Sequence, residues 1–148
     1  MELKVLSLNE NVNDPLFSSP ECQQLLEIYA DYYPKIGYNP PWIAYLILDD
    51  GIVVGSCSFT GKPVDGEVEI AYWTFKQYEG KGIASFACNE LINRAKKENP
   101  DITITAKTAP ENNASTTVLK KNGFRFSKIV QDDDIGDAWL WLLKKDTE

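Results

Sequence analysis

Apolar positions along the chain follow two periods, one typical of helices and one typical of strands, which together predict an α/β fold. Helical spacing predicts three helices, over residues 20–34, 82–99 and 112–122. Short β-rich runs predict seven strands, over residues 3–8, 42–48, 52–60, 68–75, 102–108, 124–130 and 137–143. Because no repeat or linker interrupts this series, we expect a single domain over residues 1–148.

Two connections add detail to this pattern. Asp49-Asp50-Gly51 lies between two strand-like runs and predicts a tight hairpin. Residues 35–41, after the helix that Pro34 is expected to end, form a loop rich in proline and aromatic residues. Such loops often carry recognition residues, so we expect this one to lie near a binding site.

Charge narrows the range of partners. The chain has 15 Lys and Arg against 22 Asp and Glu, which gives a net charge of −7. This acidity disfavours nucleic acid and favours a cationic substrate. The sequence contains no histidine, which excludes Ser-His-Asp and Cys-His nucleophile systems and the histidine zinc motifs, and we expect no metal.

Cysteine usage and hydropathy bear on location. Cys22, Cys57 and Cys88 are odd in number and widely spaced, which is typical of reduced thiols in a cytoplasmic protein. Cys57 and Cys88 follow the strand and helix periods and are expected in the core. The longest apolar stretch, residues 42–48, is far shorter than the about 20 residues that span a bilayer, so we expect no membrane segment.

The segment with the clearest chemistry is residues 77–84, which places Gly80 and Gly82 at a strand-to-helix turn. Glycine permits positive φ, so successive backbone N–H groups can converge on an anion in front of the helix, and a pyrophosphate is the natural ligand. The simpler alternative is an ordinary strand-to-helix connection that binds no ligand. A second alternative is a dinucleotide-binding fingerprint, because Asp101 follows about 20 residues later. Two features weigh against this fingerprint: Ser85 replaces its third glycine, and the turn follows a fourth strand, whereas the dinucleotide fold places it after the first strand.

Three segments together resemble the GNAT superfamily of N-acetyltransferases. Gln77, Gly80 and Gly82 match its Gln/Arg-x-x-Gly-x-Gly/Ala loop, and residues 112–124 are similar to its Asn-x-x-Ser helix that ends in Lys-x-Gly-Phe. Residues 69–73, Glu-Ile-Ala-Tyr-Trp, resemble a strand of the branch that contains ribosomal-protein N-terminal acetyltransferases. The order of elements agrees over nearly the whole chain.

This resemblance implies a mixed, mostly antiparallel sheet of six to seven strands, with helices on both faces and a splay between strands 4 and 5. It implies direct transfer of an acetyl group from acetyl-CoA to a primary amine. Backbone N–H groups of residues 78–84 would hold the phosphates, and backbone near Trp73 would polarise the thioester carbonyl. The residues that it assigns to the cofactor are Trp73, Thr74, Phe75, Gln77, Tyr78, Glu79, Gly80, Lys81, Gly82, Ile83, Ala84, Asn112 and Ser115.

The same resemblance suggests the proton-transfer groups. An ammonium ion must lose a proton before it attacks, and Glu69 is the candidate base; alternatively, it is a solvent-facing residue or an ion-pair partner. Leu119 stands where the family often has a tyrosine acid, so Ser115 is the candidate donor to the leaving thiolate. Glu79 is a second departure, because the family often has a basic residue there.

The acceptor is expected beside the aromatic loop, where Tyr29, Tyr32, Tyr33, Tyr38 and Trp42 gather. Of these, Tyr29, Tyr33 and Tyr38, with Glu67, are the candidate acceptor-binding residues, although core packing is an alternative for each aromatic side chain. A small cationic amine and a peptide N-terminus are both compatible, as are a monomer and a homodimer. A non-catalytic acyl-CoA-binding module and a dehydrogenase-type nucleotide domain are the alternatives to an enzyme of this family.

Overall fold

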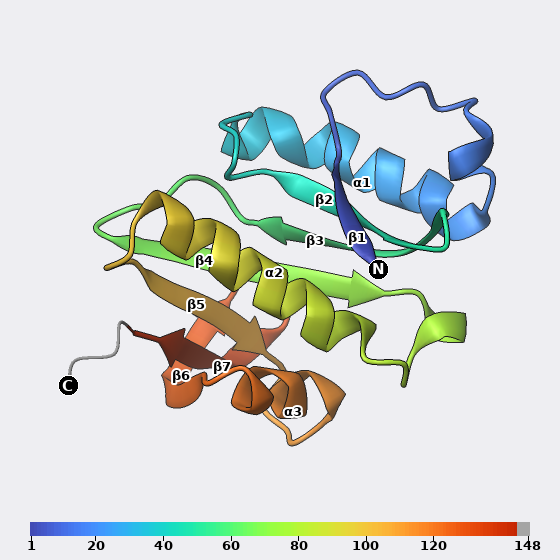
Figure 1. The fold of residues 1–148 in the computed structure, drawn as a ribbon. Coiled ribbons are helices and arrows are strands. Elements are labelled where there is room, and N and C mark those ends of the chain that lie inside the picture. The colour runs from blue at the N-terminus through green and yellow to red at the C-terminus, as the bar shows by residue number, and fades with distance from the viewer. Residues whose placement is uncertain (145–148) are drawn as a thin grey trace.

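The computed structural model describes residues 1–144 of the chain. Its elements, in chain order (Figure 1), are β1 (Glu2–Val5), the 3-10 turn η1 (Pro15–Phe17), α1 (Pro20–Ile36), β2 (Ala44–Asp49), β3 (Ile52–Phe59), β4 (Glu67–Thr74), the 3-10 turn η2 (Lys76–Tyr78), α2 (Ile83–Glu98), β5 (Thr103–Thr108), α3 (Ala114–Lys121), β6 (Arg125–Asp132) and β7 (Gly136–Leu143).

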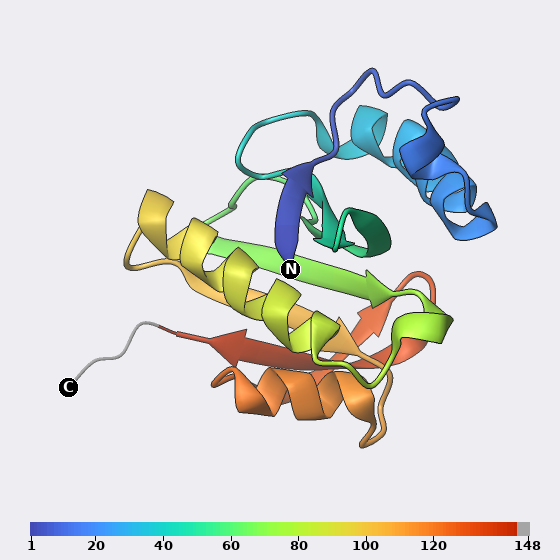
Figure 2. The ribbon, with the colours of Figure 1, turned by 45° about the vertical axis from the view of Figure 1, so that its right-hand side comes forward.

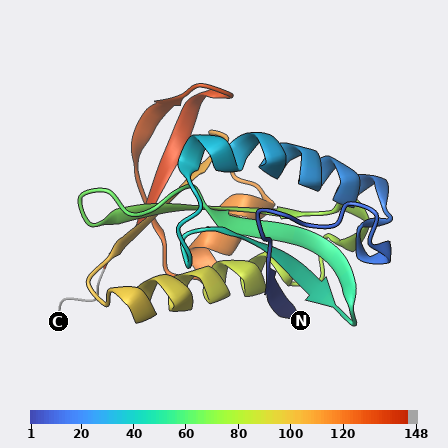
Figure 3. The same cartoon turned by 90° about the horizontal axis from the view of Figure 1, so that it is seen from above.

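The strands form one sheet in the order β1-β2-β3-β4-β5-β7-β6, and β4 and β5 are its one parallel pair. Helix α1 covers one face and α2 the other (Figure 3). Helix α3 packs beside α2, and the two helices begin at the same end of the sheet, where β4 ends (Figure 2). The mixed, mostly antiparallel sheet with helices on both faces is therefore confirmed. The dehydrogenase-type alternative is wrong, because it requires a doubly wound parallel sheet.

The two parallel strands separate after a short paired stretch. Pairing covers Glu67 with Thr103, Val68 with Ile104 and Glu69 with Thr105. Beyond Glu69, β4 continues to Thr74 with no strand partner on this side among residues 1–144, and β5 continues to Thr108. The predicted splay between strands 4 and 5 is thus confirmed, and it begins immediately after Glu69.

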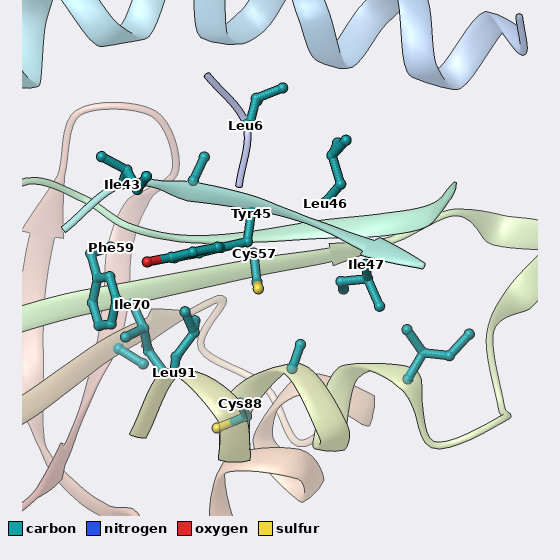
Figure 4. Packing of buried hydrophobic residues seen from close by; sticks show 14 of the residues in the cluster. Leu6, Ile43, Tyr45, Leu46, Ile47, Cys57, Phe59, Ile70, Cys88 and Leu91 are labelled. Atoms are coloured by element: carbon teal, nitrogen blue, oxygen red, sulfur yellow. The ribbon is translucent and has the colours of Figure 1, made fainter. Parts of the chain in front are cut away.

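The largest part of the core lies between the sheet and α2. Tyr45, Cys57 and Ile70 point from the strands toward Leu91 and Cys88 of the helix (Figure 4). The expected burial of Cys57 and Cys88 is confirmed, and burial raises the pKa of both thiols. All three cysteines of the described residues are free.

The predicted ends of most helices and strands lie within a few residues of the observed ends, but the predicted end of α1 is wrong. Helix α1 does not end at Pro34 but continues to Ile36 and is closed by Gly37, whose N–H donates to the carbonyl of Tyr33. The Tyr33 hydroxyl donates to the carbonyl of Leu6 at 2.7 Å and accepts from the N–H of Ala44 at 3.1 Å. These tertiary bonds fix the last turn and outweigh the loss of one helical bond at proline.

The predicted Asp-Gly hairpin is present between β2 and β3. Asp50 and Gly51 have φ values of 51° and 75°, the positive values that the tightest hairpin turns require. No helix within residues 1–144 is long and apolar enough to cross a membrane.

Candidate active site

A cleft of about 540 Å³ opens where β4 ends and where α2 and α3 begin. We call it the cofactor cleft. Its lining residues come from the end of β4, the following turn and the two helix starts: Tyr72, Trp73, Thr74, Tyr78, Glu79, Gly80, Gly82, Ile83, Ala84, Ser85, Ala114, Ser115, Thr117, Val118 and Lys121. Most residues that sequence reasoning assigned to the cofactor therefore lie together around one cavity.

The turn before α2 depends on its two glycines. Gly80 and Gly82 have φ values of 80° and 79°, and Gly82 is the N-terminal cap of α2 in a left-handed conformation. A Cβ atom at either position would meet no heavy atom within 4 Å. Glycine is needed here for the backbone conformation, and the space above the turn is open to a ligand.

The backbone amides of this turn differ in availability. The N–H of Tyr78 donates to the carbonyl of Phe75 at 2.8 Å, and that of Glu79 donates to Lys76 at 3.3 Å. Within residues 1–144, no acceptor contacts the N–H groups of residues 80–84. The run of free amides is therefore shorter than expected: it begins at Gly80, because η2 uses the two preceding amides. These amides lie at the N-terminus of a 16-residue helix, where an anion is stabilised.

Four residues assigned to the cofactor do not line the cleft, and three of them, Phe75, Gln77 and Lys81, lie in the connection between β4 and α2. Phe75 is buried, and its ring packs edge-on against Trp73 with centroids 4.9 Å apart. The Gln77 amide donates to Glu21 Oε1 of α1 at 2.6 Å, and the Lys81 ammonium lies 5.7 Å from the centre of the Tyr78 ring. Their side chains are therefore engaged with the protein rather than directed into the cavity.

The β4 wall of the cleft contains two hydroxyl groups. Tyr72, which sequence reasoning missed, donates from its hydroxyl to the carbonyl of Ser115 at 3.1 Å and so joins β4 to α3. The Thr74 hydroxyl is buried and has no hydrogen-bond partner within the described part of the chain. Strand alternation places Tyr72 and Thr74 on one face of β4, and this signal could have identified Tyr72.

Helix α3 brings one of its two predicted residues to the cleft. Asn113 caps the helix: its side chain accepts from the N–H of Thr116, and the Thr116 hydroxyl accepts from the N–H of Asn113. Ser115 follows on the exposed first turn and lines the cleft. Asn112 precedes the cap and instead lines a separate apolar hollow beside Trp139 and Trp141, so the structure does not bring it to the cofactor cleft.

Glu69 lies on the other face of β4 from Tyr72 and Thr74, which line the cleft. Its neighbours Val68 and Ile70 are buried beneath α2, so alternation turns Glu69 toward the face that α1 covers. Glu69 Oε1 is 3.4 Å from the Lys107 ammonium, which is also 3.6 Å from Asp132 Oδ2. The ion-pair interpretation of Glu69 is confirmed, and its role as a base stays a prediction.

The charges around Lys107 shift two pKa values. Partial burial lowers the pKa of Lys107, but Glu69 and Asp132 outweigh it, so the value lies above the ordinary one for lysine. The pKa of Asp132 is lowered, first by the N–H of Asp134 and then, more weakly, by Lys107.

The aromatic residues expected at an acceptor site divide into two groups. Tyr33 is buried with both hydroxyl bonds satisfied, and Tyr38 packs edge-on against it at 5.3 Å, so neither is brought to the site. Trp42 packs on Phe59, as the core alternative expected. Tyr29 is half-buried, and burial raises its pKa.

Tyr32 and Glu67 share the α1 face with Glu69. Burial raises the pKa of Tyr32, and the negative charge of Glu69 raises it further. Glu67 is exposed and lies two residues before Glu69 on the same face of β4. The face on which we expect the acceptor therefore presents Tyr29, Tyr32 and these two carboxylates.

Most of the chain is similar in sequence to a known protein family. Residues 10–125 match the sequence model of the family described as acetyltransferase (GNAT) domain. The "Putative ribosomal N-acetyltransferase YdaF" of Bacillus subtilis (strain 168) is 35% identical over 79 residues, which are 53% of this chain and 43% of that protein. The chain thus matches less than half the length of this relative.

Solved structures show the same fold. A GNAT-family acetyltransferase from Bacillus anthracis is 25% identical, with a TM-score of 0.60 over 69% of this chain and 66% of its own. The ribosomal L7/L12 alpha-N-protein acetyltransferase RimL, solved with coenzyme A, is 18% identical, with a TM-score of 0.68 over 99% of this chain and 94% of its own. At that identity the RimL likeness concerns the fold alone.

Acetyl-CoA is the cofactor of this family, and the residues of the cleft fit it. The amides of residues 80–84 and the open space above Gly80 and Gly82 suit a diphosphate. The unpartnered Thr74 hydroxyl and the edge of β4 that β5 leaves unpaired suit the amide groups of a pantetheine arm.

Proposed function

The chain belongs to the GNAT acetyltransferase family, and we propose that it is an acetyl-CoA-dependent enzyme that acetylates a primary amine. One observation carries this proposal: the N–H groups of residues 80–84 have no acceptor within the described chain and lie at a helix N-terminus over open space. An ordinary strand-to-helix connection has no need of two left-handed glycines beside a cleft of this size.

In this proposal the protein positions both reactants. The amides of residues 80–84 hold the diphosphate, and the unpaired edge of β4 at Trp73 and Thr74 aligns the pantetheine arm. Acetyl-CoA supplies an activated acyl thioester when bound. Glu69 accepts a proton from the acceptor ammonium, directly or through a water, which leaves a neutral amine able to attack. The Ser115 hydroxyl donates a hydrogen bond to the leaving sulfur.

For the acceptor, we propose the N-terminus of a ribosomal protein. The support is the match to the Bacillus subtilis relative, whose name describes a ribosomal N-acetyltransferase. The net charge of −7 and the carboxylates on the α1 face favour a cationic N-terminal segment. A small cationic amine is the second acceptor class to test.

A non-catalytic acyl-CoA-binding module is the second candidate function. Glu79 supports it, because this exposed residue puts negative charge on the lining of the cofactor cleft. Leu119 supports it as well, because this buried residue stands where the family often has a tyrosine and cannot donate a proton to the leaving thiolate.

Binding and turnover separate the two functions. Thermal unfolding is measured with acetyl-CoA, CoA and NAD, and CoA release is then measured with basic N-terminal peptides and with polyamines. The enzyme proposal expects stabilisation by acetyl-CoA but not by NAD, and turnover that Glu69→Gln abolishes. Binding without turnover on the whole panel would favour the module, and an absence of binding would contradict both.

A further inference from the structure

Lys107 lies just beyond the paired part of β4 and β5, on the same face of the sheet as Glu69. β5 pairs with β4 only as far as Thr105, and Lys107 is the next β5 residue on that face. Its ammonium nitrogen is 3.4 Å from Glu69 Oε1 and 3.6 Å from Asp132 Oδ2. One cation therefore connects β4, β5 and the last residue of β6.

The surroundings of this cation differ from those of an ordinary surface pair. The side chains of Lys107, Glu69 and Asp132 are 32%, 29% and 23% exposed, whereas the Lys35–Asp31 pair on α1 is 67% and 77% exposed. Partial burial weakens the screening of their charges by water. Because two carboxylates raise its pKa, Lys107 stays protonated in the range where amines are acetylated, so it is neither the base nor an acceptor.

The other charged or titratable groups that face Glu69 carry no positive charge. Tyr32 approaches from α1, and the charge of Glu69 contributes to its raised pKa. Glu67 precedes Glu69 on the same face of β4, and Asp132 approaches from the end of β6. Within residues 1–144, Lys107 is the one cation at ion-pair distance from Glu69.

Taking Glu69 as the base of the proposed function, we propose that Lys107 is a positioning residue: it orients the Glu69 carboxylate where β4 and β5 separate. Asp132 holds the other side of the ammonium, so the end of β6 keeps Lys107 in place. A base must be correctly placed at the moment of proton transfer, and a fixed neighbouring cation holds the carboxylate in one position.

A purely structural role makes a different prediction. If Lys107 only ties the β6–β7 hairpin to the sheet, its loss lowers stability and leaves kcat unchanged. If it orients the base, its loss lowers kcat, whereas the KM for acetyl-CoA keeps its wild-type value.

The test compares Lys107→Met, Lys107→Arg and the control Lys128→Met, which removes an exposed β6 lysine. For each, kcat, the KM for acetyl-CoA and the melting temperature are measured with an acceptor of the wild-type enzyme. We expect Lys107→Met to lower kcat roughly tenfold at an unchanged KM for acetyl-CoA, because a base contributes about 10²–10⁴-fold and a misplaced one keeps only part of this. Lys107→Arg, which keeps a cation beside Glu69, and Lys128→Met should keep the wild-type kcat. Should Lys107→Met not fold, Lys107→Gln replaces it.

An unchanged kcat in Lys107→Met would overturn the inference, even with a lowered melting temperature, because Lys107 would then be a structural tie only. Glu69→Gln separates this failure from that of the proposed function. If Glu69→Gln is inactive while Lys107→Met has the wild-type kcat, only the inference is wrong. If Glu69→Gln is fully active, or if the wild type acetylates no amine, the proposed function is wrong and the inference with it.

Discussion

Tyr72 and Ser115 meet across the mouth of the cofactor cleft, where the tyrosine hydroxyl donates to the serine carbonyl at 3.1 Å. The two residues are 43 positions apart, and the bond joins the unpaired end of β4 to the first turn of α3. The two walls between which we expect the pantetheine arm are thus held by a side chain that sequence reasoning did not single out.

Replacing Tyr72 should loosen this connection. We expect Tyr72→Phe to lower the free energy of unfolding by about 1 kcal/mol, since one hydrogen bond between β4 and α3 is lost. It should also weaken CoA binding, measured by calorimetry, several-fold. Ser115→Ala is the matched control, because it removes the serine hydroxyl but keeps the carbonyl that Tyr72 uses. Equal losses of stability in both variants would contradict the role given to the bridge.

Gly82→Val should abolish stabilisation by CoA while the domain still folds. The backbone at φ 79° is strained for any branched residue, at a cost of about 1–2 kcal/mol, and the new side chain would enter the open space above the turn. Gly66 offers a matched control, since its φ is 77° and its Cβ position is equally open, far from the cleft in the loop before β4. Thermal unfolding with and without CoA should show the ligand shift for Gly66→Val only.

Tyr33→Phe should destabilise the protein without altering the acceptor KM. The buried hydroxyl bonds both Leu6 and Ala44, and its removal leaves two backbone groups short of a partner, at about 2 kcal/mol in urea unfolding. A variant with normal stability but a raised KM would show instead that Tyr33 contacts the acceptor.

The buried thiols make stability dependent on pH. Burial raises the pKa of Cys57 and Cys88 above their ordinary values, whereas the unfolded chain ionises them near about 8.5. The folded state therefore binds more protons in alkaline solution, and the free energy of unfolding should fall as the pH rises above about 9. Urea unfolding at neutral and alkaline pH measures this. Replacing both cysteines by alanine should reduce the slope.

Sequence reasoning was strongest where a local rule decides the structure. Strand and helix periods, the Asp-Gly hairpin and the Gly80-x-Gly82 turn each depend on a few neighbouring residues, and each lies where predicted. Long-range contacts decided the rest. Pro34 stays in α1 because Tyr33 bonds β2 and the segment after β1, and Gln77 turns outward because Glu21 of α1 lies beside it.

The candidate site also combines features that follow from local sequence with features that depend on long-range contacts. The backbone of the turn follows from its glycines, but the use of the Tyr78 and Glu79 amides by η2 depends on a short 3-10 turn that no pattern signalled. The pairing of Lys107 with Glu69 and Asp132 joins residues from three strands, and only the assembled sheet brings them together.

The central claim is that the amides of residues 80–84 hold the diphosphate of CoA. Amide chemical shifts in a ¹⁵N-labelled sample titrated with CoA test it residue by residue. We expect the largest changes at residues 80–84, with small changes at Tyr78 and Glu79, whose N–H groups are already bonded. Saturable CoA binding that leaves residues 80–84 unshifted would contradict the claim.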